Sequence, residues 1–402
     1  MTPAGWPSVP RAVDDTRPRE VIVVGGGTAA HRCAVELRRD GFDGKVTLAS
    51  GESQPPYDRT LVSKDMLADH TADAVALSER CEYERWDIDL RLDLRAECVD
   101  RDSRVVGLSD GSTERYDRLA LCVGGRPVVP PELDAPGVIV LREAEHAARL
   151  RKGMVAGRHL VVIGGGFIGG EVATAAIRSG LRVTLVEAAA QMLEPILGDL
   201  VGARVAQLHR DNGVTVRTGT PANAVSSKGD GFEVSLADGA VVDADIVVLG
   251  VGMAPNIDWL DGSGLCLDKG VVTDEYCQSS ADNIFAAGDC ARWWHPDYGE
   301  LCRVEHWDTA GRHGAAAAKA ILGNQQSFAP LPFFWSDQHG VRFQWAGHAP
   351  SWDDIRIEGD APDCFVARYF RSGRLAGVFV VGQPRVFARA RRELVETAST
   401  RR

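Results

Sequence analysis

Residues Val21-Ile-Val-Val-Gly-Gly-Gly-Thr-Ala-Ala30 decide the fold of the N-terminal part of the chain. The four apolar residues are typical of a short buried strand in a parallel sheet. The glycines allow a tight turn and a close approach to a pyrophosphate, whose charge binds at the N-terminus of the helix that follows. A helix over residues 28–40 and a strand over residues 45–49 complete the unit. The turn is a G-x-G-x-x-A pattern formed by Gly25, Gly27 and Ala30.

The same pattern recurs in the middle of the chain, where it is more complete. A strand over residues 160–163 leads into Gly164-Gly-Gly-Phe-Ile-Gly169, and a helix and a strand over residues 182–186 follow. Glu187 lies where an acid accepts hydrogen bonds from an adenosine ribose. Residues 188–193 contain no Arg or Lys to bind a 2′-phosphate. The second unit is therefore predicted to bind NADH rather than NADPH.

The first unit has no acid at the corresponding position. Its second strand ends in Leu48-Ala-Ser-Gly-Glu52, so the acid is displaced along the chain. Either Glu52 reaches the ribose or Ser50 replaces the acid, and the sequence leaves both interpretations open.

A third motif is Ala281-Asp-Asn-Ile-Phe-Ala-Ala-Gly-Asp289. A short apolar strand leads to a glycine and then to Asp289, whose carboxylate is able to hydrogen-bond a polyol chain such as the ribityl group of a flavin. Alone the pair Gly288-Asp289 is an ordinary turn. Together with two dinucleotide-binding turns it predicts a flavin site.

Composition excludes several classes of protein. The 402 residues include 45 Lys+Arg and 56 Asp+Glu, which gives a formal net charge of −11. This length predicts two or three domains. The acidic excess argues against nonspecific nucleic-acid binding, because a surface that follows phosphates needs an excess of basic residues. No apolar stretch approaches the roughly 18 residues needed to span a bilayer.

The nine cysteines are scattered and form no C-x-x-C pair. We therefore expect no disulfide framework and no metal site, and we predict a reducing, cytoplasmic environment. Residues 1–18 have no apolar core of the kind that a secretory signal requires, and they are predicted to be a disordered leader.

The motifs resemble the FAD-dependent pyridine nucleotide-disulfide oxidoreductases with two dinucleotide-binding domains. The resemblance extends to the ferredoxin reductase type, which includes putidaredoxin reductase, rubredoxin reductase and the reductase components of aromatic-ring dioxygenases. It runs from about residue 20 to the C-terminus. Besides the glycine turns and residues 284–289, it is carried by Pro56-Tyr-Asp-Arg-Thr-Leu-Val-Ser-Lys64, Arg303-Val-Glu-His-Trp307 and Phe333-Phe-Trp-Ser-Asp-Gln338.

The resemblance implies an α/β fold with two Rossmann-like FAD- and NAD-binding domains of the glutathione reductase type and a C-terminal α+β domain. The expected domains are an FAD domain of residues 19–126 and 254–328, an NAD domain of residues 127–253 and a C-terminal interface domain of residues 329–402. The alternation of strands and helices supports parallel sheets independently of the resemblance.

The resemblance also implies catalytic roles for four residues. Lys64 would lie beside the flavin N5 edge and pair with Glu171. Glu305 would approach the nicotinamide carboxamide, and Trp335 would shield the flavin, although a core tryptophan is the structural alternative.

Further residues match positions that bind the two cofactors. For FAD these are Gly25, Gly27, Ala29, Ala30, Ser50, Glu52, Arg59, Lys64, Ala96, Arg142, Asp289 and Trp307. For NAD they are Gly164, Gly166, Ile168, Gly169, Glu187, Gly252 and Glu305.

A missing residue type indicates the reaction. Disulfide reductases of this architecture carry a cysteine pair before the flavin-proximal lysine, and residues 51–64 contain no cysteine. Electrons would therefore pass directly from FAD to a separate [2Fe–2S] ferredoxin or rubredoxin that serves a P450 or Rieske oxygenase. An acidic carrier would need a local basic surface, for which Arg342, Arg385 and Arg389 are candidates, unless they are ordinary solvated charges.

Two alternatives remain open at this point. One is an NADH oxidase or another flavoprotein reductase with a small-molecule acceptor. The other resembles apoptosis-inducing factor, with NADH binding that switches its partners. The sequence is compatible with a monomer or a homodimer.

Overall fold

The computed structural model describes residues 18–68 and 73–399, and it divides into two compact units. The first unit contains the described residues up to Asp58, together with Val75–Arg126 and Ala254–Pro332. The second contains the described part of Arg59–Ala74, together with Pro127–Met253 and Phe333–Arg402. Residues 1–17 of the expected leader lie outside the described residues.

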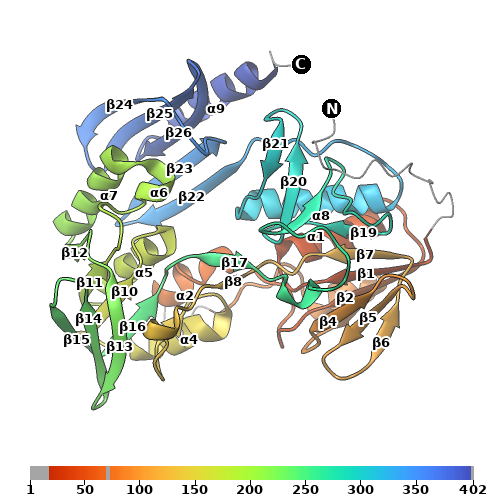
Figure 1. The fold of residues 1–402 in the computed structure, drawn as a ribbon, viewed down its shortest axis with the longest axis horizontal. Helices are drawn as coiled ribbons and strands as arrows, with labels where there is room; N and C mark the ends of the chain where they lie inside the picture. Colours follow the sequence, from red (N-terminus) through yellow and green to blue (C-terminus); the bar gives the residue numbers. More distant parts are fainter. Residues whose placement is uncertain (1–17, 69–72, 400–402) are drawn as a thin grey trace. The chain divides into compact units, whose positions relative to one another are not determined.

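The first unit is built on a five-stranded parallel sheet (Figure 1). The strands, in spatial order, are β19 (Ile284–Ala286), β7 (Arg118–Leu121), β1 (Glu20–Val24), β2 (Lys45–Ala49) and β3 (Ile88–Arg91). Apart from the edge strand β3, its strands are almost entirely buried, as expected for a parallel sheet covered on both faces.

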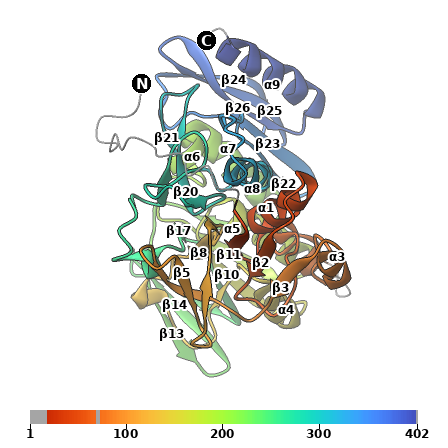
Figure 2. The ribbon, with the colours of Figure 1, turned by 90° about the vertical axis from the view of Figure 1, so that its right-hand side faces the viewer.

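Two helices of this unit pack directly against each other. They are α1 (Thr28–Arg39) and α8 (Trp307–Ile321), which lie side by side in Figure 2. Gly314 makes this approach possible, since a Cβ there would lie 2.1 Å from the carbonyl oxygen of Ala29. The close packing places the middle of α8 against the first turn of α1.

Smaller elements complete the first unit. They are the three-stranded sheet of β4 (Ala96–Asp100), β5 (Val105–Leu108) and β6 (Thr113–Arg115), the sheet of β18 (Val271–Thr273), β20 (Ala291–His295) and β21 (Glu300–Cys302), and the helix α3 (Arg80–Arg85).

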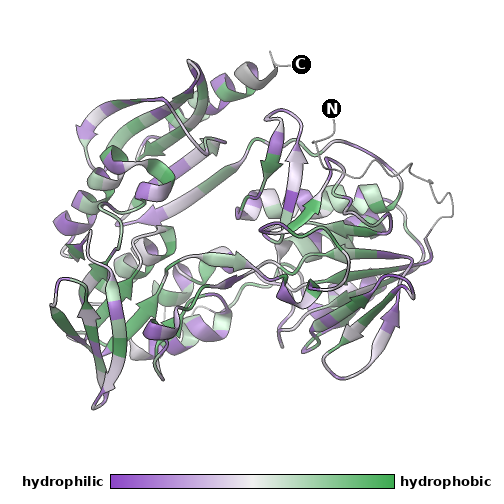
Figure 3. Ribbon diagram, viewed as in Figure 1, coloured by the Kyte–Doolittle hydropathy of each residue, from purple (hydrophilic) through white to green (hydrophobic). Residues whose placement is uncertain are grey.

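The second unit repeats the parallel arrangement. Its sheet has the order β12 (Thr215–Arg217), β11 (Arg182–Val186), β10 (His159–Ile163), β16 (Ile246–Leu249) and β9 (Ile139–Val140). The helices are α4 (Ala144–Gly153), α5 (Phe167–Arg178), α6 (Glu194–Leu197) and α7 (Asp199–Asp211), and an antiparallel sheet is formed by β13 (Ala222–Lys228), β14 (Gly231–Leu236) and β15 (Val241–Ala244). Strands β10, β11 and β16 are apolar along almost their whole length (Figure 3).

The helix α2 (Asp65–Ala68) also belongs to the second unit, where it packs against α4 and α5. The segment that carries Lys64 thus belongs to the same unit as the second glycine turn. In the sequence, however, this segment comes before most of the residues of the first unit. Two of the points at which the chain passes from one unit to the other lie in a pair of short strands, β8 (Gly125–Pro127) and β17 (Met253–Pro255).

The C-terminal part of the second unit is a five-stranded antiparallel sheet with one helix. The spatial order is β22 (Phe333–Gln338), β23 (Val341–Gly347), β26 (Arg374–Val381), β25 (Cys364–Arg371) and β24 (Asp354–Ala361), and α9 (Pro384–Ser399) packs on β23 and β26. The predicted α/β class with two Rossmann-like sheets and a C-terminal α+β part is confirmed. No helix in residues 18–68 or 73–399 is long and apolar enough to cross a membrane.

Candidate functional site

The second glycine turn, between β10 and α5, has room for backbone only. Gly164 has φ of +113°, and a Cβ there would lie 2.3 Å from the carbonyl oxygen of Gly250. A Cβ on Gly169 would lie 2.0 Å from the carbonyl oxygen of Gly164. Side chains at these positions would push the helix away from the strand, so the glycines maintain the turn that a pyrophosphate requires.

The same turn is open on the side where a ligand would bind. A Cβ on Gly166 would meet no atom within 4 Å, and the same holds for Gly252, whose φ is +115°. Ile168, in the first turn of α5, is 44% exposed. The N-terminus of α5 is therefore accessible for a phosphate group.

Glu187 is fixed at the end of β11 by backbone donors. The amide of Gly165 donates to Oε2 at 2.6 Å, and the amide of Ala189 donates to Oε1 at 2.7 Å. Both oxygens retain acceptor capacity for ribose hydroxyls. A carboxylate in this position fits an unphosphorylated adenosine ribose and repels a 2′-phosphate.

The first glycine turn has the same local geometry. Gly25 has φ of +136°, and a Cβ there would lie 2.1 Å from the carbonyl oxygen of Cys122. Ala30 is fully buried where the second turn has Gly169, so this helix accommodates a methyl group. Ala29 is also buried, and a Cβ on Gly288 would lie 3.0 Å from its Cβ. The two predicted FAD motifs of the first unit therefore meet.

Ser50 occupies the topological position of Glu187. The amide of Ser50 donates to the carbonyl of Arg91 at 2.8 Å, and the amide of Glu187 donates to the carbonyl of Arg217 at 2.8 Å, each in the next strand of its sheet. The side chain of Ser50 lies directly against Gly26, because a Cβ on Gly26 would be 2.2 Å from Ser50 Oγ.

The carboxylate of Glu52 returns to the same turn from two residues further along the chain. Glu52 Oε1 would lie 3.7 Å from a Cβ on Gly26, and Glu52 accepts a hydrogen bond of 2.8 Å from the Tyr57 hydroxyl. Ser50 and Glu52 thus both lie at the turn, with Ser50 fully buried and Glu52 only partly buried.

Gly288, which precedes Asp289, is held by a residue that the sequence did not indicate. Its amide donates to His313 Nδ1 at 3.2 Å. Burial lowers the pKa of His313 to about 3, so the ring is neutral at pH 7 and Nδ1 accepts. His313 lies on α8, and its distance along the chain from Gly288 hides this contact in the sequence.

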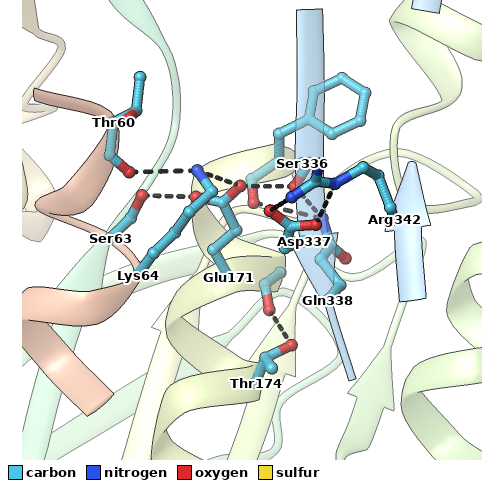
Figure 4. Close-up of polar contacts among 11 residues, drawn as sticks. Thr60, Ser63, Lys64, Glu171, Thr174, Ser336, Asp337, Gln338 and Arg342 are labelled. Carbon is cyan, nitrogen blue, oxygen red and sulfur yellow. Dashed lines mark hydrogen bonds and ion pairs between the residues drawn. The ribbon is translucent and has the colours of Figure 1, made fainter. Parts of the chain in front are cut away.

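Lys64 and Glu171 form an ion pair inside the second unit (Figure 4). Lys64 Nζ lies 2.9 Å from Glu171 Oε1, and the side chains are 17% and 3% exposed. Ser63 Oγ donates to Glu171 Oε2 at 2.5 Å, and Ser336 Oγ donates to Oε1 at 2.6 Å. Lys64 also donates to the carbonyl of Thr60 at 3.2 Å. The pair that the resemblance implies is present, with two serine donors that the sequence did not indicate.

The two remaining expected catalytic residues, Glu305 and Trp335, lie in different units, and Trp307, which was expected to bind FAD, lies in the unit of Glu305. In the first unit, Glu305 pairs with Arg303, and Trp307 begins α8 with 38% of its surface exposed. In the second unit, Trp335 lies on β22, where its ring stacks on Phe333 with the ring centroids 5.9 Å apart.

Three weaker expectations also have definite places. Arg59 Nη1 donates to the carbonyl of Arg142 at 3.4 Å, and Arg142 donates to the sulfur of Met253 at 3.5 Å, all within the second unit. Ala96 begins β4 in the first unit. The structure therefore brings Arg59 and Arg142 together and leaves Ala96 in a different unit.

The candidate docking arginines differ in their surroundings. Arg342 forms a bidentate pair with Asp337, with distances of 2.7 and 3.0 Å. Arg385 and Arg389 are exposed on α9. The charge of Arg342 is therefore compensated within the same sheet.

Cys290, next to Asp289, is not a reactive thiol. Cys290 is fully buried, and burial raises the pKa of its thiol to about 12. A thiol of this kind is inert because the thiolate is the reactive form. Among the described residues no group of three or more His, Cys, Asp or Glu is arranged to hold a metal ion.

Two family models together match most of the chain. The model described as pyridine nucleotide-disulphide oxidoreductase matches residues 19–314, and the model described as reductase C-terminal matches residues 333–402.

Individual relatives match over most of their length. The anthranilate 1,2-dioxygenase system ferredoxin–NAD(+) reductase component of Burkholderia cepacia is 35% identical over 84% of this chain and 84% of its own. Rhodocoxin reductase of Rhodococcus erythropolis is 35% identical over 93% of this chain and 89% of its own. The reductase in the crystal structure of the covalent putidaredoxin reductase–putidaredoxin complex is 32% identical, with a TM-score of 0.91 over 95% of this chain and 94% of that chain.

These matches confirm the resemblance that the motifs indicated. The chain belongs to the pyridine nucleotide-disulphide oxidoreductase family and, within it, to the ferredoxin reductases of oxygenase systems.

Proposed function

We propose that the protein is an NADH:ferredoxin oxidoreductase that contains FAD and passes electrons from NADH to a [2Fe–2S] ferredoxin. One observation carries the proposal: each unit has a strand–glycine–helix turn of the kind that binds a dinucleotide, and the second also holds the buried Lys64–Glu171 pair. Residues 51–64, where disulfide reductases of this architecture carry a cysteine pair, contain no cysteine, and the nine cysteines of the chain are free thiols.

The residues of both turns fit the two cofactors. FAD would be held in the first unit by Gly25 and Gly27, with Ser50 and Glu52 at the adenosine ribose and Asp289 at the ribityl chain. NADH would be held in the second unit by the turn at Gly164–Gly169 and by Glu187. Backbone amides at the helix N-termini would bind both pyrophosphates.

Bound FAD supplies the chemistry that the side chains lack, since a flavin accepts a hydride from a reduced nicotinamide and releases electrons one at a time. The protein's part is orientation and electrostatics. Glu171 fixes the position of the positively charged Lys64. A fixed positive charge beside the flavin would stabilise the negative charge that develops on it during reduction better than mobile water does. The buried position of Glu171 limits the access of water to the pair.

A one-electron carrier is the acceptor that the relatives favour. The Burkholderia relative is named a ferredoxin–NAD(+) reductase component, and a solved relative was trapped with putidaredoxin. For this chain we propose an acidic ferredoxin, with rubredoxin as the second candidate, docking near Arg385 and Arg389 on α9 and near Arg342. Electrostatic complementarity of this kind increases the association rate and selects the partner.

The acceptor would serve a P450 or Rieske oxygenase. We propose a cytoplasmic location because the nine cysteines are scattered free thiols, as is usual in a reducing compartment. A monomer and a homodimer both remain compatible with this proposal.

The experiment is an anaerobic titration of the flavin-loaded protein with NADH, followed by assays with several [2Fe–2S] ferredoxins and rubredoxin. Cytochrome c reports reduced carrier. Rapid cytochrome c reduction that needs one of the carriers supports the proposal. Equal rates with and without every carrier would favour the alternative of a small-molecule acceptor. A change in mass on NADH addition without turnover would favour the switched binding protein.

A further inference from the structure

A chain of hydrogen bonds extends from the Lys64–Glu171 pair through the C-terminal sheet to the far end of α7. Ser336 Oγ donates to Glu171, and Gln338 Nε2 donates to Ser336 Oγ at 3.0 Å. His209 Nε2 lies 2.8 Å from Gln338 Oε1, and His339 Nε2 lies 2.9 Å from His209 Nδ1. The inner members of this chain are 3% exposed or less, whereas His339 is only partly buried.

We propose that Ser336 and Gln338 are positioning residues for Lys64, acting through Glu171, and that His209 fixes Gln338. The assignment of Lys64 to flavin reduction rests on the proposed function. The placement of Lys64 by this chain of contacts does not.

The direction of every hydrogen bond follows from the geometry. Gln338 Nε2 donates to Ser336 Oγ and also lies 3.5 Å from the carbonyl of Phe167, so Oε1 is the acceptor that faces His209. His209 Nε2 must then carry the proton, which leaves Nδ1 to accept from His339 Nε2. Burial lowers the pKa of both histidines to about 4, so both are neutral at pH 7. All donors therefore point toward the carboxylate of Glu171.

Gly170, which precedes Glu171, leaves room for the side chain of Gln338. A Cβ on Gly170 would lie 2.5 Å from Gln338 Oε1 and 2.8 Å from its Cδ. The amide of Gln338 thus packs against the bare backbone of α5. A side chain at residue 170 would therefore displace the Gln338 amide from its place beside Ser336.

The arrangement orients Glu171 and does not conduct protons to it. An amide in the middle of a hydrogen-bond chain does not exchange its protons as a water or a hydroxyl does, so Gln338 interrupts any proton path from His339. The effect of the chain of hydrogen bonds is therefore on geometry. A carboxylate that accepts hydrogen bonds on both oxygens has one preferred rotamer, and this rotamer of Glu171 determines the position of the Lys64 ammonium group.

The first test measures the environment of Lys64 and is independent of turnover. The flavin-loaded protein and its Ser336→Ala and Gln338→Met variants are treated with limiting acetic anhydride, and acetylation of Lys64 is quantified by peptide mass spectrometry relative to exposed Lys269. We expect labelling of Lys64 to rise by roughly tenfold in Ser336→Ala, the order expected for removing one hydrogen bond to a charged group, and by less in Gln338→Met, which acts through Ser336. Thr174→Val is the matched control, since Thr174 Oγ1 on the same helix donates only to the carbonyl of Gly170.

The second test is a double-mutant cycle on the rate at which NADH reduces the flavin in anaerobic stopped flow. Ser336→Ala is expected to slow this rate by roughly tenfold in the wild-type background and to have no effect in the Lys64→Met background, since both changes act through one pair. A merely structural role of Ser336 would give the same loss in both backgrounds.

Two results would overturn the proposal. One is labelling of Lys64 in Ser336→Ala and Gln338→Met that equals labelling in Thr174→Val. The other is additive losses in the cycle. If NADH does not reduce the wild-type flavin, the proposed function is wrong, and the labelling experiment still decides whether these residues position Lys64.

Discussion

Glu171 Oε1 lies 2.9 Å from Lys64 Nζ. Glu171 is in the second turn of α5, the helix that begins at the glycine turn predicted to bind NADH. The cation is therefore tied to the nucleotide-binding element by a buried carboxylate rather than by exposed side chains. Removing one partner of a buried ion pair is strongly destabilising, because the charge of the other partner is left buried without a counter-charge.

Removing either partner of this pair is expected to slow flavin reduction. Lys64→Ala deletes the charge, and Glu171→Gln leaves it without a fixed counter-charge. Loss of one preorganised charge or donor typically reduces rates by about 10²-fold, and the partial exposure of Lys64 places the expected loss between about tenfold and 10²-fold. Stopped flow with NADH measures it, and an unchanged rate in Lys64→Ala would remove the residue from the mechanism.

Glu187 is expected to determine the choice between NADH and NADPH. Glu187→Ala removes the acceptor of the ribose hydroxyls together with two backbone hydrogen bonds, so KM for NADH should rise by about tenfold or more while kcat changes little. The preference for NADH over NADPH should fall at the same time. Asp199→Asn, an exposed change at the start of α7, is the control, and an unchanged preference in Glu187→Ala would contradict the assignment.

The two residues at the first turn can be separated by FAD retention. Glu52 has the only carboxylate of the two, so Glu52→Gln is expected to increase the dissociation constant of FAD by about tenfold, because hydrogen bonds to charged groups are the stronger ones. Ser50→Ala should have a smaller effect, since its hydroxyl is neutral. Release of flavin fluorescence measures both, and the reverse order would assign the ribose to Ser50.

Buried histidines are expected to make the protein sensitive to mild acid. Burial, reinforced by His339, lowers the pKa of His209 to about 4, whereas an unfolded histidine titrates near 6.5. Between pH 6.5 and 4 the unfolded chain therefore binds more protons than the folded protein. In that window each such histidine lowers the free energy of unfolding by about 1.4 kcal/mol for every unit by which the pH falls.

His209→Gln removes one of these groups, so its stability should fall less steeply below pH 6.5 than that of the wild type. Urea unfolding at pH 7 and pH 5 measures the difference. Parallel pH dependences in the two proteins would show that His209 is protonated with its ordinary pKa.

Docking is expected to depend more on α9 than on β23. Arg389→Glu changes an exposed charge, whereas the charge of Arg342 is already compensated by Asp337. Arg389→Glu should therefore raise KM for the ferredoxin several-fold, and Arg342→Glu should raise it less, with NADH–ferricyanide activity intact in both. Equal loss of both activities in Arg389→Glu would contradict a docking role.

The sequence predicted the parts of this account that depend on local pattern. The turns at Gly25 and Gly164 are encoded within short strand–glycine–helix segments, so their geometry follows from backbone conformation alone. The pairing of Lys64 with Glu171 came from the resemblance, because the two residues are far apart along the chain.

The contacts that the sequence did not predict all depend on packing between distant elements. Ser336 and Glu171 are separated by 165 positions, and His209 and Gln338 by 129. Ser336 and Gln338 read as ordinary alternating positions of a strand. The one local signal was Gly170, a helix-interior glycine beyond the G-x-G-x-x-G pattern, which indicates close packing.

The most direct test of the central claim is a single-turnover experiment in which flavin-loaded protein, reduced anaerobically by one equivalent of NADH, is mixed with an oxidised [2Fe–2S] ferredoxin. We expect the flavin to become oxidised as the cluster becomes reduced, in one-electron steps and without the appearance of new thiols. A flavin that NADH reduces but that neither a [2Fe–2S] ferredoxin nor rubredoxin reoxidises under these anaerobic conditions would contradict the central claim.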